Sequence, residues 1–283
     1  MKPAELSVSP LEEDLIVLGT FQRRTDATAQ CVRRTSGGAA VEVGRGTLHV
    51  RLALAHPAAL VPCDAVRLVN RYVRPLLAAL TKLGQKASYF GRDWISMGKR
   101  PVAHVGFSHD ASTGHAAFEA FVAVARPFAT GAHAARASFQ GKQPVTLEEV
   151  HARPIELGAL AESIERAYAE AYADALAILP RTSPRWEPAP LDPPWTATAD
   201  EAIGEIGAGP DAQGIFRVGG DFLASRDAVD NLERELAALR RKGTVGTDVV
   251  QPCVESLFMA PDVALVGVRS PTSLAEVIVR ALR

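Results

Sequence analysis

The sequence has few cysteines, no long apolar run and no excess of charge of either sign. Its three cysteines, Cys31, Cys63 and Cys253, are too few and too widely spaced for a disulfide framework or a paired-thiol metal site. No stretch approaches the roughly 20 apolar residues of a membrane span. The first residues also lack the apolar core of a secretory signal. We therefore expect a cytoplasmic protein that does not enter a membrane.

Charge is balanced, because 31 basic and 32 acidic side chains leave a formal net charge of −1 at pH 7. A strong positive excess is what draws a protein to nucleic acid or to an acidic membrane surface. The sequence predicts neither partner. Apolar residues make up 47% of the chain and charged residues 22%, which excludes a wholly disordered chain and predicts a sizeable core.

Proline divides the chain. Six prolines crowd one short stretch: Pro180, Pro184, Pro188, Pro190, Pro193 and Pro194. Proline lacks the amide proton and fixes φ, so such a segment runs extended. We predict a first domain over residues 1–180, a proline-rich linker over 181–200 and a small C-terminal domain over 201–283.

Apolar patterning predicts a mixture of strands and helices, an α/β (α+β) fold. Strands are expected at residues 15–19, 41–43, 47–54, 89–96, 102–107, 118–125, 215–218, 222–223 and 263–268. The second and third of these should form a hairpin around the glycines at 44 and 46. Helices are expected at residues 64–83, 157–179, 226–242 and 273–282, with Ser225 as the cap of the third.

Common nucleotide and metal motifs are missing. Gly91 and Gly98 lie too far apart for a P-loop. The histidines around residue 109 match no zinc pattern, so no metal site is predicted. Ser108, His109 and Asp110 are the residue types of a hydrolytic triad, but neighbours in sequence cannot normally adopt its geometry. We expect a solvated turn there.

Residues 33–38, RRTSGG, are the most informative segment. Two guanidinium groups, a hydroxyl and the amides of two glycines can converge on one anion. Glycine lets the backbone approach phosphate oxygens, and arginine adds bidentate, charge-assisted hydrogen bonds. The alternative is a plain glycine turn with solvated arginines, and composition alone does not separate the two.

Three segments, in the right order, resemble the lipoate-protein ligase family of the biotin and lipoate ligase superfamily. Residues 17–22, VLGTFQ, resemble its V-x-G-x-x-Q opening, and residues 33–41, RRTSGGAAV, resemble its R-R-x-S-G-G-G-A-V loop. Residues 91–93 and 98–100, GRD and GKR, stand where the family has G-R-N-D and G-R-K. The resemblance implies a biotin/lipoate ligase-like catalytic domain with mixed sheets and flanking helices, plus a small α+β C-terminal accessory domain.

The resemblance also implies an activity. With ATP and Mg²⁺, the family activates the carboxylate of lipoate or octanoate as an acyl-adenylate, and then transfers the acyl group to a lysine of a lipoyl-acceptor domain. The implied adenylate and phosphate contacts are Arg34, Ser36, Gly37, Gly38, Ala39 and Val41, and the implied catalytic residue is Lys99 or Arg100. On this basis Arg34→Ala should abolish nucleotide-dependent binding and leave the fold intact.

The sequence departs from the family at some of these positions. Ala39 replaces the third glycine, and residues 42–44, EVG, replace an aromatic residue, histidine and aspartate. Either Lys99 lies one position early or Arg100 replaces the family lysine, and arginine is a poor substitute for a compact ammonium. Glu42 and Glu119, if they faced the pocket, would repel both ATP and a fatty carboxylate.

These departures favour a second hypothesis, a non-catalytic relative that binds a small carboxylic acid or a lipoyl domain without adenylating it. A third hypothesis is an ATP-independent acyltransferase that uses Cys63, since a helix N-terminus favours a thiolate. A structural thiol at Cys63 is the simpler interpretation.

Overall fold

The computed structural model describes residues 3–27, 30–55, 64–128, 139, 142–243, 245–260 and 262–283. Within these ranges the chain forms three β-sheets and six α-helices, which confirms the expected mixed α/β class. No helix in the described part of the chain combines the length and the hydrophobicity needed to cross a membrane.

The elements have the following bounds. The strands are β1 (Ala4–Pro10), β2 (Leu15–Leu18), β3 (Cys31–Arg33), β4 (Val41–Val43), β5 (Thr47–Leu54), β6 (Ala87–Tyr89), β7 (Trp94–Met97), β8 (Arg100–His109), β9 (Ala116–Ala123), β10 (Leu176–Ile178), β11 (Glu187–Pro188), β12 (Ala197–Glu201), β13 (Gly204–Pro210), β14 (Phe216–Gly220), β15 (Leu223–Ser225) and β16 (Leu265–Val266). The helices are α1 (Leu68–Thr81), α2 (Leu147–His151), α3 (Leu157–Tyr172), α4 (Arg226–Arg241), α5 (Thr247–Phe258) and α6 (Pro271–Leu282).

The main sheet has two unlike faces. Its strands follow the order β10-β1-β5-β9-β8-β15-β16, and β7 and β6 extend it from β8. Side chains alternate between the faces of a strand, so Leu48, Val50 and Leu52 of β5 are buried in one core with α1 and α3. His49 and Arg51 belong to the opposite face, which we call the open face. The candidate site lies there.

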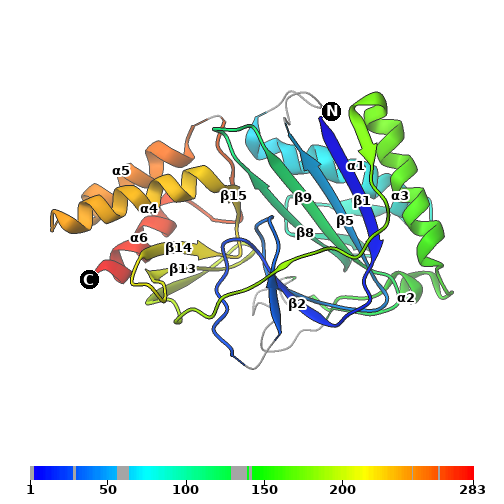
Figure 1. The fold of residues 1–283 in the computed structure, drawn as a ribbon, viewed down its shortest axis with the longest axis horizontal. Coiled ribbons are helices and arrows are strands. Elements are labelled where there is room, and N and C mark those ends of the chain that lie inside the picture. The colour runs from blue at the N-terminus through cyan, green and yellow to red at the C-terminus, as the bar shows by residue number, and fades with distance from the viewer. Residues whose placement is uncertain are drawn as a thin grey trace.

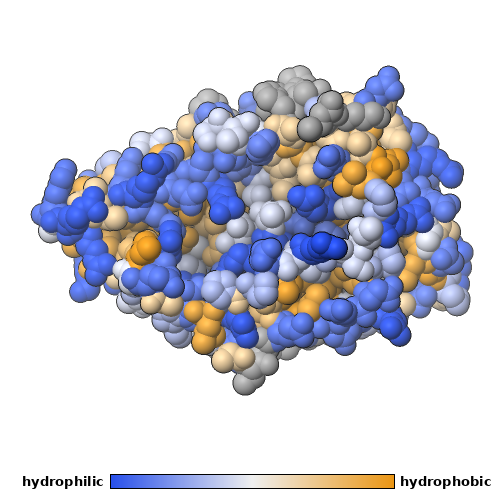
Figure 2. Space-filling model, in the orientation of Figure 1, coloured by the Kyte–Doolittle hydropathy of each residue, from blue (hydrophilic) through white to orange (hydrophobic). Residues whose placement is uncertain are grey.

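The C-terminal elements gather at the end of the molecule opposite α1 and α3 (Figure 1). The helices α4, α5 and α6 share a second core with the β12-β13-β14 sheet, and Val229, Leu232 and Leu236 form the buried stripe of α4. The outward side of this end is largely hydrophilic in the view of Figure 2. The stripe therefore faces inward, as the spacing of its apolar residues predicts.

Two strands tie the C-terminal and linker segments to the rest of the chain. β15 runs parallel to β8 and pairs Ser225 with His109. β11, inside the predicted linker, pairs antiparallel with β3, and the guanidinium carbon of Arg23 lies 3.6 Å from the ring centroid of Trp195. The division at residues 1–180, 181–200 and 201–283 remains a prediction.

The expected hairpin of residues 41–43 and 47–54 is wrong. Both strands form, but β4 pairs with β2 in the four-stranded sheet, and β5 pairs with β1 and β9 in the main sheet. Val41 and Val43 pack in a different core cluster from Leu48 and Val50. The glycine turn therefore passes the chain from one sheet to another.

The expected helix 157–179 is too long, and the expected cap residue of α4 is confirmed in position but makes no capping bond. The helix α3 ends at Tyr172, and Leu176 begins β10, which pairs parallel with β1. Tertiary pairing thus overrides the helix propensity of the alanines. Ser225 precedes α4 but makes no side-chain capping bond to it. Its hydroxyl instead contacts His109 and the amide of Ala264.

Candidate functional site

The loop that spans residues 33–41 lies directly on the open face of the main sheet. The amide of Gly37 donates to the carbonyl of Phe107 on β8 at 2.9 Å, and the amide of Gly38 donates to the carbonyl of Phe222 at 2.9 Å. Beneath the loop is Gly106 of β8, where a Cβ atom would lie 2.4 Å from Ser36 Oγ. Glycine at position 106 therefore allows the loop to approach the strand.

We expect Gly106→Ala to lower the free energy of unfolding by about 1 to 3 kcal/mol, because the added methyl group overpacks the contact with Ser36. Urea unfolding measures this. The matched control is Gly158→Ala in α3, where the new Cβ would meet only the flexible carboxylate of Glu156, at 3.0 Å. That variant should be at least as stable as the wild type. Equal stability of the two variants would contradict the close loop contact.

Arg34 is directed into the loop itself. The side chain is 1% exposed. Its Nε donates to Ser36 Oγ at 3.0 Å, Nη1 donates to the carbonyl of Val17 at 3.1 Å, and Nη2 donates to the carbonyls of Gly37 and Ala39 at 2.9 Å each. Burial lowers the pKa of Arg34 to about 10, so the group stays charged at neutral pH. In the described conformation Arg34 holds the loop together.

Glu119 of β9 provides the negative charge opposite Arg34. Its carboxylate accepts from the amide of Ser36 at 3.1 Å and lies 3.1 Å from His49 Nε2. Burial alone would raise the pKa of Glu119, but contacts with His49 and Ser36 and the charge of Arg34 outweigh it and lower the pKa to about 2. The backbone amide of Ser36, which the family resemblance assigns to the adenylate, therefore already donates to the carboxylate of Glu119.

The C-terminal segment fixes the loop from the other side. Gln22, the last residue of the VLGTFQ segment, accepts from the amide of Gly19 at 2.8 Å and donates to Asp221 Oδ1 at 2.5 Å. The rings of Phe21 and Phe222 stack with centroids 4.9 Å apart. The loop is thus held between the main sheet and the segment that precedes α4.

The structure brings only part of the expected site together. The loop residues Arg34, Ser36, Gly37, Gly38, Ala39 and Val41 are contiguous and buried. Lys99 and Arg100 are exposed at the turn between β7 and β8, where Arg100 lies 3.8 Å from Glu149. At a rise of about 3.3 Å per strand residue, this turn is about 20 Å along β8 from Gly106. The catalytic role of Lys99 or Arg100 remains a prediction.

Two further candidate sites from the sequence were Cys63 and residues 108–110. Cys63 lies outside the described residues. The expected solvated turn at residues 108–110 is wrong, because Ser108 and His109 are buried in β8. They do not form a triad with Asp110, since Ser108 donates to the carbonyl of Thr35 and His109 contacts Ser225.

A cavity of about 480 Å³ opens beside the loop on the open face, and we call it the sheet cavity. Its polar lining consists of Glu5, Thr35, Arg51, Ser108, His109, Asp110, His115 and Arg226, and its apolar lining of Pro3, Ala53, Leu54, Ala55, Ala116 and Ala117. Among the described residues, neither Arg51 nor Arg226 has a hydrogen-bond or ion-pair partner. Two guanidinium groups without a direct partner in the described part of the chain therefore share a partly apolar hollow with the carboxylates of Glu5 and Asp110.

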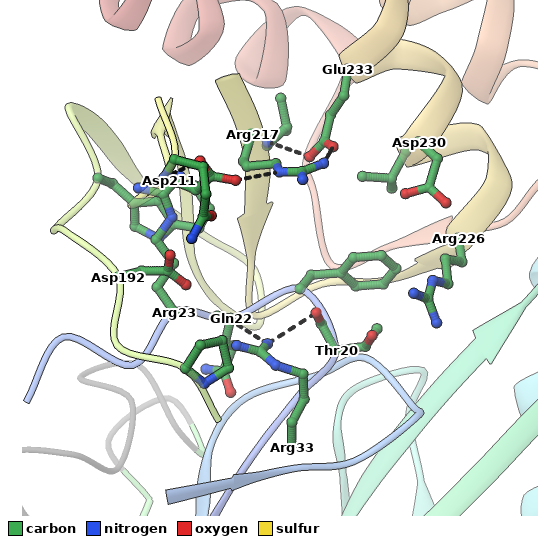
Figure 3. Close-up of a pocket in the computed structure, with 16 residues that line it drawn as sticks. Thr20, Gln22, Arg23, Arg33, Asp192, Asp211, Arg217, Arg226, Asp230 and Glu233 are labelled. Carbon is green, nitrogen blue, oxygen red and sulfur yellow. Dashed lines mark hydrogen bonds and ion pairs between the residues drawn. The ribbon is translucent and has the colours of Figure 1, made fainter. Parts of the chain in front are cut away.

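A second cavity of about 340 Å³ lies between the loop after β2, the linker and α4 (Figure 3), and we call it the linker cavity. Most of its cations are already bonded. Arg217 lies between Asp211 and Glu233, and Arg33 donates to backbone carbonyls of the loop after β2. Arg226 lines both cavities, and no dashed line reaches it in Figure 3. We assign the linker cavity a mainly structural role.

Arg51 and Arg226 are not among the site residues predicted from the sequence. In the segment TLHVRLAL of β5, polar residues alternate with Leu48, Val50 and Leu52, and this period of two places Arg51 on the face away from the core. The alternation in β5 could therefore have identified Arg51 from the sequence. Arg226 reaches the cavity because β15 pairs with β8, and no local pattern reports a pairing between segments so far apart.

Comparison with solved structures finds proteins of similar fold, whereas comparison by sequence finds none. No protein-family model and no curated protein sequence matches the chain. P. falciparum LipL1, solved in complex with lipoate, aligns over 98% of this chain and 86% of its own, with 11% identity and a TM-score of 0.58. A bi-partite lipoate protein ligase from Thermoplasma acidophilum aligns over 64% and 75%, with 12% identity and a TM-score of 0.48. Biotin protein ligase from Aquifex aeolicus, in complex with biotin and ATP, aligns over 56% and 70%, with 12% identity and a TM-score of 0.39.

Proposed function

We propose that this chain, which has the fold of a lipoate-protein ligase, is an ATP-dependent lipoate or octanoate protein ligase. In the first step a carboxylate oxygen of the acid attacks the α-phosphorus of ATP, and pyrophosphate leaves. In the second step the unprotonated amine of an acceptor-domain lysine attacks the acyl carbon, AMP leaves, and the lysine nitrogen gives up a proton. A shared fold supports this reaction only by analogy. The main support must therefore come from the residues of the site.

The observation that carries the proposal is the sheet cavity. Arg51 and Arg226 offer two guanidinium groups with no hydrogen-bond partner among the described residues, which suit a carboxylate or a phosphate, and the hydroxyl of Thr35 lines the same space. Of the two carboxylates in this lining, that of Asp110 already accepts hydrogen bonds from Ser112 and Thr113, and Glu5 is the other. Ala53 and Ala117 provide an apolar floor for an acyl chain. Positive charge fixed beside the reacting group also stabilises the negative charge that develops as pyrophosphate leaves.

The described residues offer no preformed metal cage, because no group of three or more His, Cys, Asp or Glu side chains among them could hold an ion. Mg²⁺ usually keeps several waters and is bound through one or two carboxylates together with substrate phosphates. In this proposal Mg²⁺ is therefore held chiefly by the phosphates of ATP and by water, and no residue is assigned to it.

A second candidate function is that of the non-catalytic relative, which binds a small carboxylic acid or a lipoyl domain without adenylating it. The contact between Glu119 and the amide of Ser36 favours it, because a carboxylate already occupies this donor. The amides of Gly37 and Gly38 are likewise bonded to protein carbonyls. A ligase would have to exchange some of these contacts for contacts with ATP.

Exchange of labelled pyrophosphate into ATP separates the two functions. The ligase predicts exchange that depends on lipoate or octanoate. The non-catalytic relative predicts that one of these acids, or a lipoyl domain, binds without exchange.

We expect Arg51→Ala and Arg226→Ala each to weaken octanoate binding about tenfold, since a hydrogen bond to a charged group contributes about 1.5 to 3 kcal/mol. Titration calorimetry on the intact protein measures the dissociation constants. Arg74→Ala is the matched control, because Arg74 is exposed on α1, which packs on the other face of the sheet. Wild-type affinity in both cavity variants would place the acid elsewhere.

A further inference from the structure

Glu5 of β1 brings a carboxylate to the sheet cavity. The antiparallel pairing of β1 with β5 sets Glu5 directly opposite Ala53, in a register without a shift. Ala4 and Leu6, its neighbours along β1, are buried in the core with α1 and α3. Because side chains alternate between the faces of a strand, the Glu5 side chain lies on the open face, where it lines the cavity and is exposed.

Arg51 is the diagonal neighbour of Glu5 on the same face. Arg51 pairs with Ser7, two residues along β1 from Glu5. Diagonal neighbours of this kind lie about 7 to 8 Å apart, within reach of long side chains. Among the described residues, no hydrogen bond or ion pair joins the Glu5 carboxylate to Arg51 or to any other group. The cavity therefore presents a carboxylate and a guanidinium that lie near each other without pairing.

Two opposite charges in this arrangement can receive two different groups of a reacting pair. Arg51 suits the carboxylate of the acid, whereas Glu5 repels a carboxylate and attracts an amine. The second step of the proposed reaction brings an amine to the acyl carbon, and its nitrogen gains positive charge as the new bond forms. Asp110 is less suited to this nitrogen, because it already accepts hydrogen bonds from Ser112 and Thr113.

We infer that Glu5 is a catalytic residue of the second step, whose carboxylate accepts a hydrogen bond from the attacking nitrogen of the acceptor lysine and takes its proton. This inference rests on the proposed function. The nitrogen lone pair forms the bond to the acyl carbon, the bond from that carbon to the AMP oxygen breaks, and one proton moves from nitrogen to Glu5, which returns it to water. General-base catalysis of this kind contributes about 100- to 10,000-fold. The first step takes no proton from the ionised acid, so it does not require Glu5.

The two steps respond differently to Glu5→Gln, which removes the charge and keeps the size of the side chain. We expect pyrophosphate exchange with octanoate to stay within about threefold of the wild type or to rise, since a charge that repels the acid is lost. Transfer from the adenylate to Nα-acetyl-lysine amide should fall about 100-fold, and Glu5→Asp should restore part of it. Glu170→Gln is the matched control, because Glu170 is exposed on α3, which packs on the other face of the sheet. It should change neither step.

The outcomes separate this role from the proposed function. Transfer at the wild-type rate by Glu5→Gln would overturn the role of Glu5 and leave the ligase in place. Equal losses in exchange and transfer would also overturn it, because a structural residue affects both steps. A wild type that forms the adenylate but does not acylate the lysine amide would show that the cavity admits no amine. A wild type that forms no adenylate with lipoate or octanoate would overturn the proposed function and this role with it.

Discussion

Arg34→Ala is expected to lower the free energy of unfolding by about 3 to 5 kcal/mol, because it removes several buried hydrogen bonds from a charged donor, each of which contributes about 1.5 to 3 kcal/mol before relaxation. The guanidinium is fully buried and donates to four acceptors of the loop and of β2. Its loss leaves those acceptors unpaired and removes one of the positive charges that keep the pKa of Glu119 low. Urea unfolding with a linear extrapolation measures the change.

Arg45→Ala is the control for this experiment. Arg45 is also an arginine beside a glycine, but its side chain is 83% exposed and its contact with Glu12 is 3.9 Å long. Its replacement should change stability by about 0.5 kcal/mol or less. The sequence alone predicts an intact fold for Arg34→Ala, and the buried hydrogen bonds of Arg34 reverse that expectation. Wild-type stability of Arg34→Ala would show that the loop does not depend on this side chain.

Glu119→Gln is expected to cost a comparable amount at neutral pH, about 3 kcal/mol, and to change the response to acid. The pKa of Glu119 is lowered from 4.5 to about 2 in the folded protein. A carboxylate with a lowered pKa stabilises the native state fully above its unfolded pKa and loses that contribution as the pH falls toward the folded value. The wild type should therefore lose this contribution between about pH 4.5 and 2, whereas Glu119→Gln has no such contribution to lose.

The matched control is Glu149→Gln. Glu149 is half exposed and lies 3.8 Å from Arg100, so its ion pair contributes little. Stability measured from pH 7 to pH 2 should follow the wild type for Glu149→Gln, and the difference between wild type and Glu119→Gln should shrink as the pH falls. A constant difference across this range would contradict the role of the Glu119 charge.

Patterns within one segment predicted much of the fold. Leu48, Val50 and Leu52 alternate cleanly, and β5 is where this alternation indicates. The helix α5 was missed because Pro252 lies inside it and weakens its periodic signal. The strand β10 was missed because its assignment depends on pairing with β1, which residues 176–178 do not encode by themselves.

The candidate site was predictable in composition but not in orientation. Residues 33–38 have the chemistry of an anion-binding loop. The direction in which Arg34 points is decided by Glu119 and Gly106, which are brought beneath the loop by β9 and β8. The sequence of residues 33–38 does not predict these contacts, because they depend on strands far away in the chain. For the same reason, the loop and the turn at Lys99 could be aligned with one family motif while standing apart in space.

The ligase and the non-catalytic relative differ in whether the contact between Glu119 and the amide of Ser36 has to break. The ligase requires an acid in the sheet cavity, beside Arg51 and Arg226, whereas the non-catalytic relative binds either such an acid or a lipoyl domain. A ligase must also release the amide of Ser36 from Glu119, or reach the nucleotide phosphates with other donors, because adenylation requires hydrogen-bond donors and positive charge at the α-phosphate. The contact of Glu119 with Ser36 is therefore the feature on which activity depends.

The most direct test of the central claim is to incubate the purified full-length protein with ATP, Mg²⁺ and either lipoate or octanoate, and to analyse the products by mass spectrometry. The proposed function predicts an acyl-adenylate and pyrophosphate with one of the acids, in amounts reduced by Arg51→Ala and by Arg226→Ala and unaffected by Arg74→Ala. A folded protein that binds one of these acids but forms no adenylate would contradict ligase activity and identify the chain as a non-catalytic relative.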